Sequence, residues 1–430
     1  MTKNKISVIL PSYNVVDYIV DAVTSVLEQT LKEIEIICVD AGSEDGTWEK
    51  LEYFANLDSR VILIKSDKKS YGYQVNLGLE ISQGEYIAIV ETDDFVQPEM
   101  YEVLYSLAVA NDCDYIKANY RAYWTQNDGK KIFTIRENLQ KKELYGKVIS
   151  PKEYTILGTD DWYLWTGIYK REQIEKNHIR LSESKGAAFQ DIGFLIKTIQ
   201  HADRVMYIDD KLYNYCIDRE GASSRQNRSL EYSYTEFKSL MKYPRSEKWE
   251  NELFYHRMLR SFMCCVSEIY FNDCEEKQEY IRWFIENLQR ALEKDYLNVS
   301  VINESIWSNF NLLCSDIEEY FYEREKWKNR IINALREKEI LSIVIFGCGN
   351  YGYDAYKWTK RECINLLGFM DNNEELWNTR IDGIRVFSPN DIASIDQATG
   401  FVIANEKSYL QIRDQLLLNS ISETRIYRYR

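Results

Sequence analysis

The sequence predicts an α/β protein with a mostly parallel sheet in its first half, a helical middle region and a small second α/β domain at its carboxyl end. Three observations predict this: apolar strands alternate with helices up to about residue 110, long charged and aromatic helices follow, and the alternation returns from residue 341. The chain of 430 residues exceeds what one hydrophobic core usually organises. We place the domains at residues 1–229, 230–338 and 339–430.

The first domain consists of short elements in regular alternation. Strands are predicted at residues 6–10, 35–39, 61–64 and 86–90, and helices at 17–29, 48–57 and 74–82, from the spacing of apolar residues. Such continuous apolar strands are typical of a parallel sheet that helices cover on both faces. Ligands of these sheets bind beyond the carboxyl ends of the strands. Those ends read PSYN (11–14), DAGS (40–43) and ETDD (91–94), so three polar clusters should meet at one edge.

The rest of the chain divides into three stretches. Residues 115–229 are mixed and rich in aromatic side chains, as in TDDWYLWTGIYK (159–170). Residues 230–338 are almost wholly helical in pattern, and their Trp and Phe residues are expected to form the core of a helical bundle. The last stretch begins with a strand at 343–346, continues with GCGNYG and a helix, and has a second strand at 365–370. Shorter strands are predicted near 384–387, 401–404 and 424–427.

Composition excludes several classes of protein. A net charge of −14 argues against nucleic acid as the main partner, because phosphate binding needs clustered Lys and Arg. The nine cysteines contain no C-x-x-C pair and the three histidines are scattered, which indicates free thiols in a reducing compartment and no zinc site. No apolar signal region or membrane-length span is present. We therefore expect a cytoplasmic protein and leave open peripheral contact with the inner face of the membrane.

The acidic run ETDD carries the first candidate chemistry. Carboxylates at the end of a buried strand can hold Mn²⁺ or Mg²⁺, which prefer oxygen ligands and share them with substrate phosphates. Asp93 is the candidate ligand, and such a cation would neutralise a diphosphate leaving group. The alternative is that Asp93 or Asp94 only caps the helix that follows Pro98.

The order of the clusters adds a family resemblance. The segments VILPSYNVVDYIVDAVTSVLEQT, IICVDAGSEDGT and NLGLEISQGEYIAIVETDD resemble the first half of the family-2 glycosyltransferases, which have a GT-A fold, a Rossmann-like fold that binds nucleotide sugars. The resemblance covers roughly residues 5–225. It implies a metal-dependent, hexosyltransferase-like enzyme that moves a sugar from a nucleotide sugar, foremost a UDP-sugar, to an acceptor hydroxyl in bacterial surface polysaccharide or glycoprotein synthesis. The implied acceptor is a glycan, a lipid-linked sugar or a protein, and a homo-oligomer is left open.

The resemblance also assigns roles to individual residues. The nucleoside side of the donor pocket is assigned to Pro11, Tyr13, Asn14, Asp40, Gly42, Ser43 and Asn76, and the ribose and metal side to Glu91, Thr92 and Asp93. The segment LYNYCIDREGASS (212–224) resembles a loop that closes over the diphosphate, so Arg219 and Arg225 are the candidate phosphate contacts.

Asp191 is the candidate general base. The resemblance implies direct inversion, in which Asp191 takes the acceptor proton while the metal on Asp93 stabilises the departing diphosphate. The alternative role for Asp191 is a helix N-cap. Ala41, Glu91 and Gln190 depart from the residues that the family commonly has at these positions. Those departures motivate a second hypothesis, a nucleotide-sugar-binding regulatory protein without turnover.

The carboxyl-terminal domain contains a glycine motif. Gly347, Gly349 and Gly352 form G-x-G-x-x-G between a strand and a helix, and Asp371 follows about twenty residues later, a context that fits a nucleotide site. A tight strand–helix turn is the structural alternative. The domain resembles the small Rossmann-like domain at the start of sugar O-acyltransferases, which implies a binding, regulatory or oligomerisation module. A nicotinamide-dependent oxidoreductase is a third hypothesis.

Overall fold

The computed structural model describes residues 4–125, 131–154, 157–217, 219, 229–267, 269, 274–405 and 408–429. The chain divides into two compact units. The first comprises Met1–Tyr123, Phe133–Ile269 and Glu275–Phe310, and the second comprises Trp124–Ile132, Tyr270–Cys274 and Asn311–Arg430. Each unit is described by itself.

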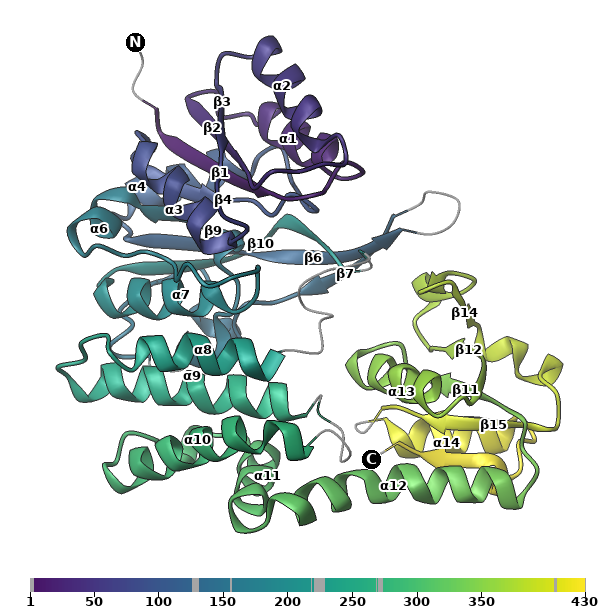
Figure 1. The fold of residues 1–430 in the computed structure, drawn as a ribbon. Coiled ribbons are helices and arrows are strands. Elements are labelled where there is room, and N and C mark those ends of the chain that lie inside the picture. The colour runs from purple at the N-terminus through teal and green to yellow at the C-terminus, as the bar shows by residue number, and fades with distance from the viewer. Residues whose placement is uncertain are drawn as a thin grey trace. The chain divides into compact units, whose positions relative to one another are not determined.

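A mixed ten-stranded sheet forms the centre of the first unit (Figure 1). Its order is β3-β2-β1-β4-β9-β6-β10-β5, with β7 paired to β6 and β8 paired to β10. The strands are β1 (Ile6–Ser12), β2 (Ile34–Asp40), β3 (Val61–Lys65), β4 (Tyr86–Ile89), β5 (Phe95–Val96), β6 (Tyr115–Thr125), β7 (Lys131–Arg136), β8 (Val148–Ile149), β9 (Gly167–Lys170) and β10 (Val205–Cys216). The first four run parallel, whereas β9 runs antiparallel between β4 and β6.

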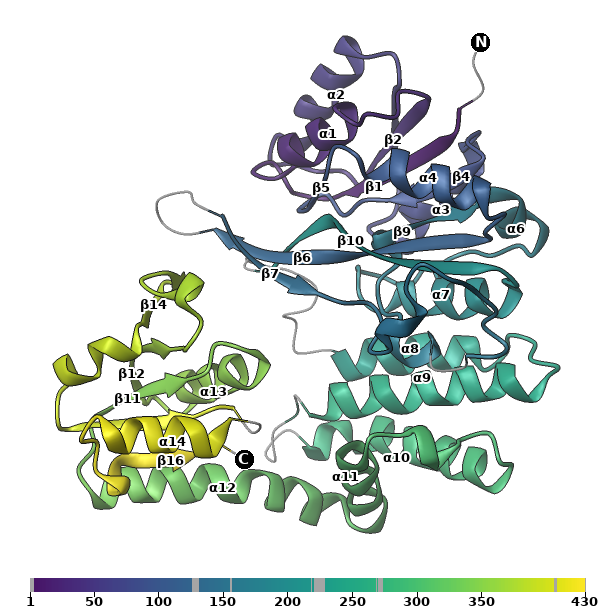
Figure 2. The same ribbon diagram turned by 180° about the vertical axis from the view of Figure 1, so that it is seen from behind.

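Helices enclose the parallel part of this sheet. They are α1 (Ile19–Leu27), α2 (Thr47–Leu57), α3 (Tyr71–Ile81) and α4 (Met100–Ala110). Chain order β1, β2, β3 moves in one direction across the sheet and β4 returns to the other side of β1, so right-handed crossovers place α1 and α2 together and α3 on the opposite face. Figures 1 and 2 show α1 and α2 side by side. Every residue of β1 and β2 is therefore buried.

The later part of the first unit is helical. Short helices α5 (Leu157–Asp160) and α6 (Arg171–Lys176) precede α7 (Gln190–His201), and α8 (Ser229–Leu240) and α9 (Lys248–Val266) pack in succession on α7. The helix α10 (Cys274–Glu293) joins them through aromatic rings, because Phe284 stacks on Phe262 with 4.7 Å between centroids. In this way the helical layer and the sheet meet at α7.

The second unit has its own six-stranded sheet, of order β13-β14-β12-β11-β15-β16. Its elements are α11 (Glu304–Ser315, at the boundary), α12 (Ile317–Glu337), β11 (Ser342–Phe346), α13 (Asn350–Arg361), β12 (Asn365–Met370), β13 (Arg380–Ile381), β14 (Ile384–Phe387), β15 (Thr399–Ile403), α14 (Tyr409–Leu418) and β16 (Ile426–Arg428). Alternate residues of β11 enter two cores: Ile343 and Ile345 lie in one, Val344 and Phe346 in the other. Both faces of the sheet are therefore covered.

Among the helices of the described ranges, none combines the length and the apolar character that crossing a bilayer requires.

Candidate active site

The carboxyl ends of β1, β2 and β4 lie together, as their order in the sheet requires. The Thr92 hydroxyl donates to the Pro11 carbonyl at 2.9 Å, and the Ser12 hydroxyl donates to the Asp40 carboxylate at 3.1 Å. The backbone N–H of Asn14 donates to the Ser43 hydroxyl at 2.8 Å. The three polar clusters thus form one connected edge.

Asp40 organises the turn that follows β2. Its buried carboxylate accepts hydrogen bonds from the backbone N–H groups of Gly42 (3.0 Å) and Ser43 (2.9 Å) and from the Ser43 hydroxyl (2.6 Å). Gly42 has a φ of +75°, and a Cβ there would meet open space, so the glycine is needed for the backbone conformation alone. Asp40 is therefore occupied in shaping the turn, and the backbone at Gly42 stays open to a ligand.

Tyr13 and Asn14 form the outer rim of this edge. Tyr13 is 39% exposed, and the Lys69 ammonium lies 4.5 Å from its ring centroid and donates to its hydroxyl at 2.6 Å. Asn14 adopts a φ of +50°, and its side-chain oxygen accepts from the backbone N–H of Glu44 at 3.0 Å. A flat aromatic ring beside a cation offers a stacking surface to an anionic, planar ligand.

The three acids after β4 have different surroundings. Asp94 is buried and accepts from the Tyr213 hydroxyl (2.8 Å) and from the backbone N–H of Cys216 (2.7 Å), and burial raises its pKa well above the usual range. Asp93 is partly exposed and pairs with the Arg219 guanidinium at 2.9 Å. Asp94 thus ties β4 to β10, and Asp93 faces outward.

Glu91 is the first residue of the acidic run that follows β4, and its side chain is half-buried. Its carboxylate accepts from the Tyr71 hydroxyl at 2.5 Å. Burial raises the pKa of Glu91 to about 8, and the charges of Asp93 and Asp191 add to that rise, although the Tyr71 hydrogen bond and Arg219 oppose it. Tyr71 belongs to α3, and the next residue of that helix, Gly72, donates its backbone N–H to the side chain of Gln190 at 2.8 Å. The neighbours of Asp93 and Asp191 are therefore joined through α3.

Asp191 is the second residue of α7. The helix begins after Phe189, which has a φ of +66° and makes no side-chain cap, so Asp191 is not the N-cap that the sequence allowed as an alternative. Its carboxylate accepts from the adjacent Ile192 N–H at 3.0 Å. Burial raises the pKa of Asp191, and the positive charges of Arg257 and Lys117 act in the opposite direction. A half-buried carboxylate of raised pKa is suited to accept a proton.

Gln190, directly before Asp191, joins α7 to α3. Its side-chain oxygen accepts from the Gly72 N–H at 2.8 Å, and its side-chain nitrogen donates to the Ser184 hydroxyl at 2.7 Å and the Ser184 carbonyl at 2.5 Å. An amide satisfies both needs at once, whereas a carboxylate could not donate. The local hydrogen bonding therefore accounts for glutamine at this position.

The remaining donor-site candidates differ in accessibility. Asn76 is buried and bonds both ways with the backbone of Leu181, at 3.0 Å each, so its amide holds residues 181–183. Arg219 reaches the site and also donates weakly to the Asn14 carbonyl at 3.5 Å. Arg225 lies outside the described residues.

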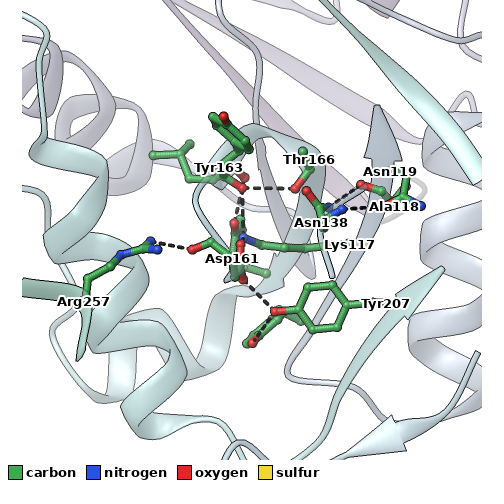
Figure 3. Close-up of polar contacts among 12 residues, drawn as sticks. Lys117, Ala118, Asn119, Asn138, Asp161, Tyr163, Thr166, Tyr207 and Arg257 are labelled. Atoms are coloured by element: carbon green, nitrogen blue, oxygen red, sulfur yellow. Dashed lines mark hydrogen bonds and ion pairs between the residues drawn. The ribbon is translucent and has the colours of Figure 1, made fainter. Parts of the chain in front are cut away.

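A buried ionic cluster, whose Lys117 and Arg257 act on the pKa of Asp191, was not among the sequence candidates. Figure 3 shows Asp161 at its centre: Lys117 and the Tyr207 hydroxyl (2.7 Å) bond its carboxylate, and Arg257 donates to its backbone carbonyl. Lys117 and Asp161 are fully buried, and burial lowers the pKa of Lys117 to about 8 against the attraction of Asp161. The one sequence signal was a lysine within the apolar strand segment YIKANY (115–120).

The donor set for a metal is a single accessible carboxylate. Among the described residues no group of three or more His, Cys, Asp or Glu side chains could hold an ion without further ligands. Mg²⁺ and Mn²⁺ commonly bind through one or two carboxylates and the phosphates of a substrate. Asp93 fits that kind of shared site, provided that Arg219 moves from it.

The carboxyl-terminal glycine motif has a defined internal structure. Gly347 has a φ of +117°, and a Cβ on Gly352 would lie 1.9 Å from the Gly347 carbonyl oxygen. The Asp371 carboxylate accepts from the backbone N–H of Cys348 (2.8 Å) and of Asn373 (2.9 Å). Gly349 precedes α13 and has open space around it. Backbone conformation thus explains Gly347 and close packing explains Gly352, while the Asp371 carboxylate holds the loop by two hydrogen bonds.

Comparisons with known proteins follow the same division of the chain. Residues 7–162 match the family described as Glycosyl transferase family 2, and residues 339–427 match the family described as C2185-like, N-terminal. The chain is 31% identical over 220 residues to glycosyltransferase GlyG of Streptococcus pneumoniae, which is 49% of this chain and 70% of that protein. It is 30% identical over 237 residues to the uncharacterized glycosyltransferase YibD of Escherichia coli, covering 53% and 67% respectively.

A solved structure extends the likeness to the fold. Staphylococcus aureus TarS 1–349 in complex with UDP-GlcNAc superimposes with a TM-score of 0.59 at 16% identity, covering 76% of this chain and 92% of that one. This confirms the predicted fold class, with a GT-A-like sheet, a helical middle region and a separate carboxyl-terminal sheet domain. The match of the last domain does not name an acyltransferase, so that resemblance stays a prediction.

Proposed function

The chain belongs to glycosyl transferase family 2, and from that premise we propose that it transfers a sugar, with inversion and with the help of a divalent metal, from a UDP-sugar to an acceptor hydroxyl. One observation carries the assignment of roles: neighbouring residues of α3 contact both sides, because Tyr71 donates to Glu91, two residues before Asp93, and Gly72 donates to Gln190, directly before Asp191. A donor held between Asp93 and Asp191 would have its diphosphate near Asp93 and its anomeric carbon on the side of Asp191, the general base.

The donor lies at the strand ends in this proposal. The exposed ring of Tyr13 and the open backbone at Gly42 receive the nucleoside, while Lys69 and Arg219 supply positive charge for the diphosphate. The choice of uridine draws support from the UDP-GlcNAc in the related TarS structure. The family often has a second acid at the position of Ala41, close to the nucleobase. The identity of the nucleobase is therefore the first property of the donor to test.

The reaction then needs one base. Asp191 accepts the proton of an acceptor hydroxyl, that oxygen forms a bond to the anomeric carbon, and the bond from this carbon to the diphosphate oxygen breaks on the opposite side. The nucleoside diphosphate leaves with the electron pair. A cation bound by Asp93 and the phosphates would supply the charge neutralisation that the leaving group requires.

The biological setting follows from the relatives. TarS is named as a poly(ribitol-phosphate) β-N-acetylglucosaminyltransferase of Staphylococcus aureus, and this chain is 26% identical to it over 222 residues. We propose that this chain likewise builds a bacterial surface glycan, with a glycan, lipid-linked or protein acceptor.

The test is nucleoside diphosphate release from a panel of UDP-, GDP- and dTDP-sugars with Mn²⁺. We expect release by the wild type and a loss of about 100-fold or more in Asp191→Asn and in Asp93→Ala, because removal of a general base or of charge stabilisation has this magnitude. Glu286→Gln, on an exposed ion pair with Arg290, is the control and should retain activity. Donor binding by calorimetry without any release would instead support a regulatory protein.

A further inference from the structure

Arg257 is a fully buried arginine on α9, and only part of its guanidinium makes hydrogen bonds. One nitrogen, Nη2, donates to the Asp161 carbonyl, while Nε and Nη1 are buried and have no hydrogen-bond partner among the described residues. The carboxylate of Asp161 is already taken by Lys117 and Tyr207. A buried cation is costly unless a nearby anion balances it, so a second anion is needed.

Asp191 is the anion in range. The helix α9 packs on α7, which carries Asp191 in its first turn. Burial raises the pKa of Asp191, and Arg257 is the strongest influence that opposes this rise. Burial likewise lowers the pKa of Arg257 to about 10, and Asp161 and Asp191 oppose that fall. The two groups therefore stabilise each other's charged form.

The other groups around Asp191 do not replace Arg257. Titratable groups that interact with Asp191 come from five further elements: Tyr71 of α3, Glu91 after β4, Lys117 of β6, Tyr169 of β9 and Glu236 of α8. The adjacent α6 carries Arg171, Glu172, Glu175 and Lys176, of which Arg171 and Glu175 pair at 2.6 Å. Of the five, only Lys117 is a cation, and its ammonium is bound to Asp161.

We propose that Arg257 is a positioning residue for the reaction: from α9 it holds the Asp191 carboxylate charged and oriented toward the acceptor, and the Lys117–Asp161 pair fixes the guanidinium in turn. This inference rests on the proposed function, because it needs Asp191 as the base. The inference gives α9 a role in positioning the general base, although α9 lies outside residues 7–162, which match the family.

A stability cycle tests the pairing without any donor. Melting temperatures are measured for the wild type, Arg257→Gln, Asp191→Asn and the double variant. We expect the double variant to melt higher than the summed losses of the single variants predict. Arg260→Gln is the matched control: Arg260 lies on the same helix and over the same Trp162 ring, at 5.4 Å against 4.3 Å, but pairs with Asp160. Additive losses for Arg257 and Asp191 would overturn the pairing.

The pH dependence of turnover tests the catalytic consequence. The probe is the panel nucleotide sugar that the wild type hydrolyses fastest. Arg257→Gln should lower kcat about tenfold at unchanged donor KM and move the acid limb of the profile about one unit to higher pH, because loss of a nearby positive charge favours the protonated carboxyl. Arg257→Lys should keep the limb near its wild-type position, and Arg260→Gln should change neither quantity.

The outcomes separate the inference from the proposed function. An unshifted acid limb in Arg257→Gln, or an equal shift in Arg260→Gln, overturns the positioning role. If Arg257→Gln does not fold, Arg257→Lys decides, because an ammonium lacks the planar fork and should lower kcat; a wild-type kcat would refute the inference. Retained turnover in Asp191→Asn, or no hydrolysis of any donor by the wild type, refutes the proposed function, while the melting cycle still reports on the pairing.

Discussion

Gln190 shows how one side chain can fix the position of its neighbour Asp191, the base of the proposed mechanism. Its amide bonds Gly72 of α3 and Ser184, and it is buried. We expect Gln190→Glu to destabilise the first unit by about 1–3 kcal/mol, because a carboxylate would face the Ser184 carbonyl without a proton to donate. Urea unfolding measures this loss.

The control is the same chemical change at a less buried position. Gln278→Glu in α10 changes the same atoms where the side chain accepts from Arg282 at 3.0 Å. It should leave the free energy of unfolding within about 0.5 kcal/mol of the wild type. Equal effects of the two substitutions would show that the Gln190 network does not stabilise the fold.

At the scale of elements, the sequence predicted local structure well where apolar residues were continuous. The predicted strands at 6–10 and 365–370 correspond to β1 and β12, and the predicted helix at 48–57 corresponds to α2. The insertion of β9 between β4 and β6 was not predictable, because a four-residue strand depends on partners about 50 and 80 residues away. The sheet is consequently mixed rather than mostly parallel beyond β4.

The same limit applies to the candidate site. Strand ends are visible in a sequence, so the grouping of residues 11–14, 40–43 and 91–94 could be predicted from the alternation of elements. The buried ionic cluster could not be predicted, since Lys117, Asp161 and Arg257 are brought together only by tertiary packing. A polar side chain inside an apolar run indicates such a cluster but not its members.

The contact between α7 and α8 contains a buried acid with a pH-dependent effect. Glu236 accepts a hydrogen bond from Ser182, and burial raises its pKa to about 7. A group whose pKa is raised by folding contributes stability at low pH that is lost as the pH rises through the folded value. Between about pH 4.5 and pH 7, this loss is on the order of 3 kcal/mol for the wild type.

Glu236→Gln should remove that dependence, because the amide does not titrate. We expect the free energy of unfolding of this variant, relative to the wild type, to rise from pH 5 to pH 8 and then level off, as followed by urea titrations at each pH. Glu231→Gln removes the same charge from the same helix at a less buried position. The difference in free energy of unfolding between this variant and the wild type should not change with pH. The same result for Glu236→Gln would contradict the argument from burial.

At the scale of the whole molecule, the two units have separate sheets, and the second has two apolar cores of its own. Calorimetry of the full chain should therefore report on each unit, as is usual for chains of more than one domain. Activity depends on residues of the first unit in the proposed mechanism. Substitutions in the second unit should therefore change the stability of that unit and leave donor turnover unchanged, so the two quantities can be measured independently.

Asp371 offers the sharpest such substitution. Its carboxylate accepts from the backbone N–H groups of Cys348 and Asn373, so Asp371→Ala leaves two donors without this partner and should destabilise the second unit by about 1–3 kcal/mol at unchanged donor turnover. Asp414→Ala, which breaks an exposed ion pair with Arg413, should have little effect on stability.

A ligand experiment would contradict a purely structural role for Asp371. In that case a nucleotide or NAD(H) would raise the melting temperature of the wild type but not of Asp371→Ala, because ligands stabilise the state that binds them. That outcome would mean that the Asp371 carboxylate gives up its hydrogen bonds to the loop and binds the ribose of the nucleotide instead.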